Sequence, residues 1–301
     1  MTFTPYTAAA IQVAPVPGPL TAASIKANTD KCVDYVERCV AATGASLVVL
    51  PESCTTGFTT GLAAPELAGL VSEIGGATTA PLQEAASRLG MHLCFGTYER
   101  RDADTVFNTA VLAGPDGEVL GVYRKSQPFP GEDAARGGWV TAGTEVCVAD
   151  TALGRIGMAI CFDGDYPELW RIMAVQGAQV ICRPSALLRS ADLWELTNRA
   201  RAYDNHTWVI GANATGADPA GVLYFGNSMI VSPIAEVTAR AASHESWVSA
   251  RIDREGAAGP LTPGSSVAQG FDHVADRNLD LIRRYADDLL GERKAESSAS
   301  G

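Results

Sequence analysis

Residues 154–170 read GRIGMAICFDGDYPELW, and this stretch decides the fold class. Its apolar first half predicts a buried strand. Asp165, Pro167 and Glu168 then give the pattern of a helix start, with a capping aspartate, a proline in the first turn and a glutamate three residues after the cap. A strand that leads directly into a helix is the unit of an α/β sheet.

Cys161 falls at the turn between this strand and this helix. A side chain at such an elbow lies at the carboxyl edge of the sheet, where free N–H groups can lower a thiol pKa and bind an oxyanion. Cysteine is also among the most buried residue types, so a core thiol is the alternative interpretation. A nucleophilic cysteine needs a base, and the spacing of the four histidines supports no Cys–His dyad.

The same alternation of apolar runs and helical stretches continues along the chain and predicts the α/β class. Strands are expected at residues 9–13, 47–50, 92–98, 108–113, 119–123, 156–161, 180–182, 207–212, 224–231 and 247–252. Helices are expected at residues 22–42, 79–89, 167–176, 191–205 and 277–290. Gly114-Pro115-Asp116-Gly117 predicts a hairpin turn. Residues 1–292 are expected to form one domain, and residues 293–301 a disordered polar tail.

Composition narrows the class of protein and its partners. The 301 residues are 47% hydrophobic, enough for a large core, and the apolar runs are too short to span a bilayer. A net charge of -11 without a basic cluster argues against nucleic acid and favours a small-molecule partner. The odd count of seven cysteines and the absence of a secretory pattern at the N-terminus favour a cytoplasmic location.

Two other strand ends supply chemistry that a thiol could use. Glu52 follows the strand at 47–50, and Pro51 ends that strand so that the carboxylate falls at a sheet edge. Lys125 follows the strand at 119–123, where an ammonium could stabilise an anion. Each residue alone has a simpler interpretation, because such glutamates and lysines usually face water.

Three motifs in this order resemble the nitrilase superfamily of carbon–nitrogen hydrolases, whose signature is a Glu-Lys-Cys triad. They read LVVLPESCTTGF at 47–58, GVYRKSQPFPGE at 121–132 and GRIGMAICFDGDYPELWR at 154–171. The stretches RAYDNHTWVIGAN at 201–213 and YFGNSMIVSP at 224–233 are also similar to that family. The resemblance implies a four-layer α-β-β-α sandwich whose subunits pair into a homodimer or a higher oligomer.

The resemblance also implies roles for five groups. Cys161 would attack the substrate carbon, and Glu52 would act as the base and later as the acid. Lys125 and the backbone N–H of Phe162 would hold the oxyanion, while Glu132 matches a second family glutamate that positions Lys125. The reaction would pass through a thioester, with no cofactor and no metal.

The residues after the nucleophile indicate the branch. Nitrile-cleaving members usually show Cys-Trp-Glu, whereas Cys161-Phe162-Asp163 is nearer the amidases and carbamoyl hydrolases. The expected substrate is a small linear amide or an N-carbamoyl compound. A nitrilase that makes acid and ammonia, and a catalytically silent binding member, stay open as alternatives.

Substrate-binding candidates follow from their distance to the motifs. They are Phe58, Trp139, Phe162, Arg183 and Trp194. The aromatic residues could equally pack in the core. Arg183 could clamp a substrate carboxylate or form a salt bridge to a nearby acidic residue.

Overall fold

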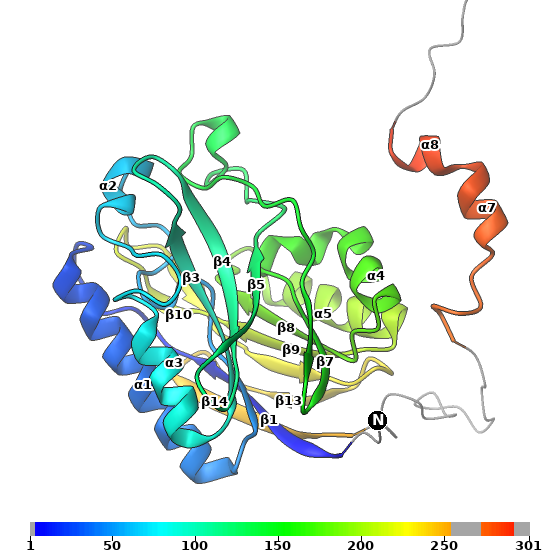
Figure 1. Ribbon diagram of the computed structural model, residues 1–301, viewed down its shortest axis with the longest axis horizontal. Helices are drawn as coiled ribbons and strands as arrows, with labels where there is room; N and C mark the ends of the chain where they lie inside the picture. The colour runs from blue at the N-terminus through cyan, green and yellow to red at the C-terminus, as the bar shows by residue number, and fades with distance from the viewer. Residues whose placement is uncertain (1–3, 254–271, 292–301) are drawn as a thin grey trace, which may run out of the picture.

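Two six-stranded sheets stack face to face in the computed structural model, which describes residues 4–253 and 272–291 (Figure 1). The first sheet has the order β14 (Ser246–Ile252), β1 (Tyr6–Gln12), β2 (Leu47–Val49), β3 (His92–Arg100), β4 (Val106–Ala113) and β5 (Val119–Arg124). The second has the order β13 (Val237–Arg240), β12 (Met229–Val231), β9 (Trp208–Asn213), β8 (Val180–Ser185), β7 (Gly154–Met158) and β6 (Val148–Thr151). Each sheet has three parallel strands flanked by antiparallel ones, β1 to β3 in the first and β7 to β9 in the second.

Helices cover the outer face of each sheet, which confirms the predicted four-layer α-β-β-α sandwich (Figure 1). The first sheet carries α1 (Ala22–Thr43) and α3 (Ala80–Leu89), and the second carries α4 (Pro167–Val175) and α5 (Ala191–Asn205). Side chains alternate along β1 as a two-sided buried strand requires. Ala8 and Ala10 pack between the sheets, whereas Ala9 and Ile11 pack under the helices.

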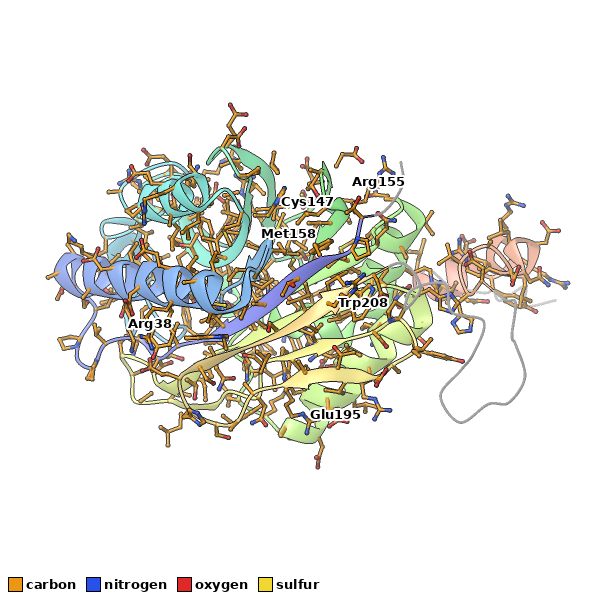
Figure 2. The ribbon with its side chains drawn as sticks, turned by 90° about the horizontal axis from the view of Figure 1, so that it is seen from below. Arg38, Cys147, Arg155, Met158, Glu195 and Trp208 are labelled. Atoms are coloured by element: carbon orange, nitrogen blue, oxygen red, sulfur yellow. The ribbon has the colours of Figure 1, made fainter. Side chains whose placement is uncertain are left out.

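The interior between the sheets is closely packed at the edge where β5 meets β7. Cys147 and Met158, labelled in Figure 2, lie against Gly121 of β5. A Cβ atom on Gly121 would stand 2.9 Å from Cys147 Sγ and 3.1 Å from Met158 Cε, so a larger residue there would displace these side chains between the sheets.

Local sequence signals fix the ends of several elements. Thr21 and Ser24 form a capping box at the start of α1, and Gly44 ends that helix with a φ of 65°. The predicted hairpin turn joins β4 to β5 through a Gly117 N–H that donates to the Gly114 carbonyl.

Other predictions were wrong in detail. Residues 224–231 form β11 (Leu223–Phe225) and β12, because Gly226 and Asn227 adopt left-handed φ angles of 68° and 59°. β11 pairs instead with β10 (Thr215–Ala217), and the expected helix at 277–290 is divided into α7 (Leu279–Arg284) and α8 (Ala286–Leu289). Also present, and not expected, are β6, β13 and α2 (Ala64–Ala68).

The expected helix cap at Asp165 was also wrong. Tyr166 occupies the N-cap of α4, and the Asp165 carboxylate pairs with Arg189 at 2.8 Å. The predicted tail at 293–301 lies outside the described residues, and the single domain over 1–292 stays a prediction. Within 4–253 and 272–291, no helix is both long and apolar enough to cross a membrane.

Candidate active site

Cys161 stands at a strained bend, and two residues separate it from the end of β7. The chain enters a 3-10 helix, η2 (Cys161–Asp165), and Cys161 takes a φ of 42°, in the left-handed region that non-glycine residues avoid. Holding such a conformation costs about 1 to 3 kcal/mol, so the surrounding contacts must impose it. The side chain is 7% exposed and lies in the wall of a pocket.

Glu52 reaches the same place from the other sheet. It follows β2 and Pro51, and it is 1% exposed. Its Oε2 accepts a 2.7 Å hydrogen bond from the N–H of Ala186, which follows β8. Burial and the Glu52 carboxylate raise the pKa of the Cys161 thiol, and the same Ala186 N–H acts against this rise.

Lys125 joins Glu52 to a second buried carboxylate. Its Nζ lies 2.7 Å from Glu52 Oε1 and also pairs with Glu132 Oε1, and all three side chains are buried. The backbone fixes the position of Lys125, because its N–H donates to the Asn108 carbonyl at 2.8 Å. The same Glu132 Oε1 also accepts a hydrogen bond from the N–H of Phe129 at 2.8 Å. These contacts form a carboxylate–ammonium–carboxylate cluster inside the protein.

Asn108 of β4 bridges the two carboxylates. Its Nδ2 donates to Glu52 Oε1 at 2.7 Å and to Glu132 Oε2 at 3.0 Å. The sequence interpretation missed this residue. Its signal was an Asn, followed by a Thr, inside the mostly apolar run VFNTAVLA, since a buried amide requires polar partners.

Burial and the two carboxylates set the protonation of the cluster. Burial acts to lower the pKa of Lys125, but Glu132 and then Glu52 outweigh it, so that pKa lies well above its usual value. Burial raises the pKa of Glu132; Lys125 opposes this rise and Glu52 adds to it. Burial, and next the Glu52 carboxylate, raise the pKa of the Cys161 thiol, against the opposing charges of Lys125 and Arg183. The resting thiol is therefore protonated at neutral pH, beside a carboxylate.

Asp163 ties the cysteine elbow to the end of β5. Its carboxylate accepts from the Ile160 N–H at 2.8 Å, from the Tyr123 hydroxyl at 2.9 Å and from the Gln127 N–H at 3.0 Å. Burial raises the pKa of Asp163 to about 6 despite these donors. Because Lys125 lies between Tyr123 and Gln127 in the chain, this carboxylate fixes the nucleophile and the ammonium relative to each other.

The pocket beside Cys161 is small and mostly apolar. It encloses about 310 Å³ of empty space, including solvent at its mouth. Its walls are Phe58, Phe129, Phe162, Ala186, Leu187, Leu188 and Arg189, with Cys161. Phe58 and Phe162 were sequence candidates, and their contact with substrate stays a prediction.

The remaining candidates lie outside this pocket wall. Trp139 packs behind Phe58, with ring centroids 6.0 Å apart. Trp194 is fully buried, and its indole N–H donates to the Asn227 carbonyl at 2.7 Å.

Arg183 is fully buried, and its guanidinium donates to the Cys161 carbonyl, Thr197 Oγ1 and Asn198 Oδ1. The predicted carboxylate clamp and the predicted salt bridge at Arg183 were therefore both wrong. Arg183 follows Cys182 on a strand, and alternation turns its side chain toward the helices instead of the pocket. The sequence interpretation passed over Arg189, six residues further along, which lies in the pocket wall itself.

Comparison with known proteins shows the family of this chain. The profile of the carbon-nitrogen hydrolase family matches residues 7–259. The human omega-amidase NIT2 is 33% identical over 242 residues, covering 78% of this chain and 86% of that protein. The chloroplastic omega-amidase of Arabidopsis thaliana is 31% identical over 271 residues, covering 83% of this chain and 73% of that protein.

Solved structures show the same fold. An amidase from Nesterenkonia sp. superposes with a TM-score of 0.75 at 23% identity, covering 93% of this chain and 96% of that chain. Nit3 of Saccharomyces cerevisiae, described as a member of branch 10 of the nitrilase superfamily, gives 0.74 at 24% identity, covering 86% and 95%. The chain therefore belongs to the carbon-nitrogen hydrolase family of the nitrilase superfamily and is a hydrolase that acts on carbon–nitrogen bonds other than peptide bonds.

Proposed function

We propose that this protein is a thiol amidase that hydrolyses a small linear amide or N-carbamoyl compound. One observation carries the proposal: the buried cluster of Glu52, Lys125 and Glu132 lies beside Cys161 at an apolar pocket. This cluster supplies a base, an acid and an anion-stabilising charge around a single nucleophile.

In the first half of the reaction, Cys161 attacks the carbonyl carbon of the amide. Glu52 takes the thiol proton as the sulfur–carbon bond forms, because the raised pKa of Cys161 leaves no free thiolate waiting. Lys125 Nζ and the N–H of Phe162 hold the oxyanion. Glu52 then gives its proton to the leaving nitrogen, the carbon–nitrogen bond breaks, and ammonia leaves a thioester on Cys161.

In the second half, water hydrolyses the thioester. Glu52 takes a proton from the water as its oxygen attacks the carbonyl carbon, and Lys125 and Phe162 again hold the oxyanion. The carbon–sulfur bond breaks, the proton returns to the sulfur, and the acid departs. Glu132 positions Lys125 throughout through their ion pair.

The walls of the pocket favour a short acyl chain with a charged far end. The Arg189 guanidinium lies 5.4 Å from the Phe162 ring centroid and pairs with Asp165 at 2.8 Å, in a side chain 31% exposed. A guanidinium has five donors, so it can bind a substrate carboxylate while it holds Asp165. We therefore favour an amide whose other end carries a carboxylate; the omega-amidase names of the relatives are consistent with this class.

A matched substrate pair tests the role of Arg189. Kinetics of wild type and Arg189→Gln are compared on an amide that ends in a carboxylate and on its neutral methyl analogue. We expect KM for the acidic amide to rise about tenfold or more in the variant, with the neutral amide affected less than threefold. Equal effects on both substrates would remove Arg189 from substrate recognition.

Ammonia release from a substrate panel tests the activity itself. Wild type and Cys161→Ala are incubated with short aliphatic amides, N-carbamoyl compounds and the nitriles that match the amides. We expect wild type, but not Cys161→Ala, to release ammonia from an amide or an N-carbamoyl compound. Ammonia from nitriles and not from the matching amides would favour the nitrilase alternative, and no ammonia from any class would favour the silent member.

A homodimer is part of the proposal. Apolar side chains stand on the outer surfaces of α4 and α5, where Ile172, Val175 and Leu196 are 46%, 54% and 61% exposed. α7 and α8 lie apart from the sandwich and expose Leu281 and Leu289 (Figure 1). Burying these surfaces against a second copy would remove them from water. Sedimentation that shows a stable monomer at micromolar concentration would contradict this assembly. A small-molecule substrate and a cytoplasmic location complete the proposal.

A further inference from the structure

Arg183 is a buried cation placed directly behind the nucleophile. It belongs to β8, is 0% exposed, and faces α4 and α5. Its Cζ lies 5.9 Å from the ring centroid of Trp170 and 4.8 Å from that of Trp194, so the guanidinium is enclosed between two indoles. Neither half of the reaction described above uses this residue.

The guanidinium holds the carbonyl of the nucleophile in a fork. Nε and Nη2 both donate to the Cys161 carbonyl oxygen, at 3.1 and 2.6 Å. Nη1 donates to Thr197 Oγ1 at 2.9 Å and to Asn198 Oδ1 at 2.8 Å. These acceptors are all neutral, so the hydrogen bonds hold the guanidinium in place without neutralising its charge, as a bound carboxylate would.

The bend of η2 is shaped around this side chain. A Cβ atom on Gly164 would stand 1.9 Å from Arg183 Nη2, so only glycine leaves room for the fork. Cys161 itself takes the strained φ of 42°, which needs an external contact to hold it. The two hydrogen bonds to its carbonyl are such a contact.

The Cys161 carbonyl, which Arg183 binds, and the Phe162 N–H, which would bind the oxyanion, belong to the same peptide group. The Cys161 carbonyl and the Phe162 N–H share one planar trans peptide, so they point in opposite directions. Phe162 is also the second residue of η2, where an N–H has no partner within the helix. A cation bound to the carbonyl end withdraws electron density from the peptide and strengthens its N–H as a donor.

We propose that Arg183 is a positioning residue that orients and polarises the Cys161–Phe162 peptide, so that the Phe162 N–H faces the oxyanion. This inference rests on the proposed thiol mechanism. The two hydrogen bonds to the Cys161 carbonyl should then determine how tightly the oxyanion is bound. The positive charge alone should determine the effect of Arg183 on the pKa of the Cys161 thiol, because Arg183 also favours the thiolate.

Two variants separate these effects. Arg183→Lys keeps a charge and loses the fork, and Arg183→Gln loses both. The pH dependence of Cys161 alkylation by iodoacetamide reports the thiol pKa and forms no oxyanion. We expect Arg183→Gln to shift this profile to higher pH and Arg183→Lys to leave it close to that of the wild type.

A short aliphatic aldehyde tests the oxyanion contact without any amide turnover. The thiol adds to the aldehyde carbonyl, a sulfur–carbon bond forms, the proton moves to the oxygen, and that oxygen occupies the oxyanion site. Protection of Cys161 from alkylation measures this binding. We expect it to weaken at least tenfold in both variants, and kcat on amides to fall on the order of 10²-fold with KM changed less than threefold.

Arg201 provides the matched control. It also donates a hydrogen bond to η2, to the Gly164 carbonyl at 3.1 Å, but the N–H of that peptide is not proposed to bind the oxyanion. Arg201→Gln should leave aldehyde protection within threefold of wild type. Folded Arg183→Lys with normal aldehyde protection, or equal losses in Arg201→Gln, would overturn the inference. A wild type that is protected by aldehyde but hydrolyses no amide would instead count against the proposed function alone.

Discussion

Gly96 of β3 sets how closely that strand approaches the backbone of Glu52, the proposed base. A Cβ atom there would stand 2.6 Å from Glu52 Cα and 2.8 Å from the Pro51 carbonyl oxygen. Ordinary contact begins near 3.4 Å, so Gly96→Ala requires a shift of about 0.8 Å in β3 or in Glu52. Both neighbours are backbone atoms, and therefore no rotamer change can relieve the clash.

The expected result is a loss of activity larger than the loss of stability. Overpacking of this kind lowers the free energy of unfolding by about 1 to 3 kcal/mol, which leaves the enzyme folded at room temperature. A misplacement near 1 Å at a reacting group reduces kcat roughly 10²-fold. Kinetics on the best amide, with thermal unfolding of the same samples, measure both quantities.

Gly131→Ala is the control for this experiment. A Cβ atom on Gly131 would meet only Phe129 Cδ1, at an ordinary 3.9 Å, although the residue adjoins Glu132. We expect its kcat to stay within threefold of the wild type. A folded Gly96→Ala enzyme with normal kcat would refute the argument that this glycine sets the position of Glu52.

Three further substitutions test the buried network. Glu132→Gln removes one of the two carboxylates that raise the pKa of Lys125, so the alkaline loss of activity should begin at lower pH and kcat should fall about tenfold or more. An unchanged alkaline limb of the pH–rate profile would show that Glu132 does not control the pKa of Lys125. Asn108→Ala leaves Glu52 and Glu132 without their shared donor and should lower the free energy of unfolding by about 1 to 3 kcal/mol, measured by urea denaturation; full stability would show that the bridge is dispensable. Burial raises the pKa of Asp163 to about 6 in the folded protein, so its contribution to the free energy of unfolding is full below about pH 4 and is lost as the pH rises through 6. Over the same pH interval we expect kcat to rise as the Asp163 carboxylate forms. Asp163→Asn should abolish both slopes, and a variant that keeps the wild-type profile would assign them to another group.

Short-range patterns predicted most strands and helices of the α/β class, and the resemblance of three motifs to a known family predicted their four-layer arrangement. Residues such as Ala8 to Ile11 are apolar on both faces, as strands buried on both faces must be. β12 was merged with β11 because the break at Gly226 and Asn227 depends on two backbone angles that a run of strand-forming residues conceals. β13 has polar and half-exposed residues at alternate positions, so it carried little apolar signal.

Some of the site residues could likewise be predicted from the sequence, and others could not. Glu52, Lys125 and Cys161 each follow a strand, and their convergence at strand ends could be expected from three motifs in order. The placement of Arg183 could not, because a side chain near the end of a strand faces the pocket or the helices according to register alone. The sequence alone allows Asp163 either to shape the pocket or to cap the helix that follows. The structure shows its carboxylate tying Ile160 to Tyr123 across the two sheets.

The measurement that tests the central claim most directly is the intact mass of the enzyme, quenched in acid during turnover of a short amide. The account predicts a population heavier by the mass of the acyl group, localised by peptide mapping to Cys161 and lost on treatment with hydroxylamine. It also predicts that Cys161→Ala never acquires this mass. Ammonia release by wild type without an adduct, or with an adduct on another residue, would contradict the thioester at Cys161.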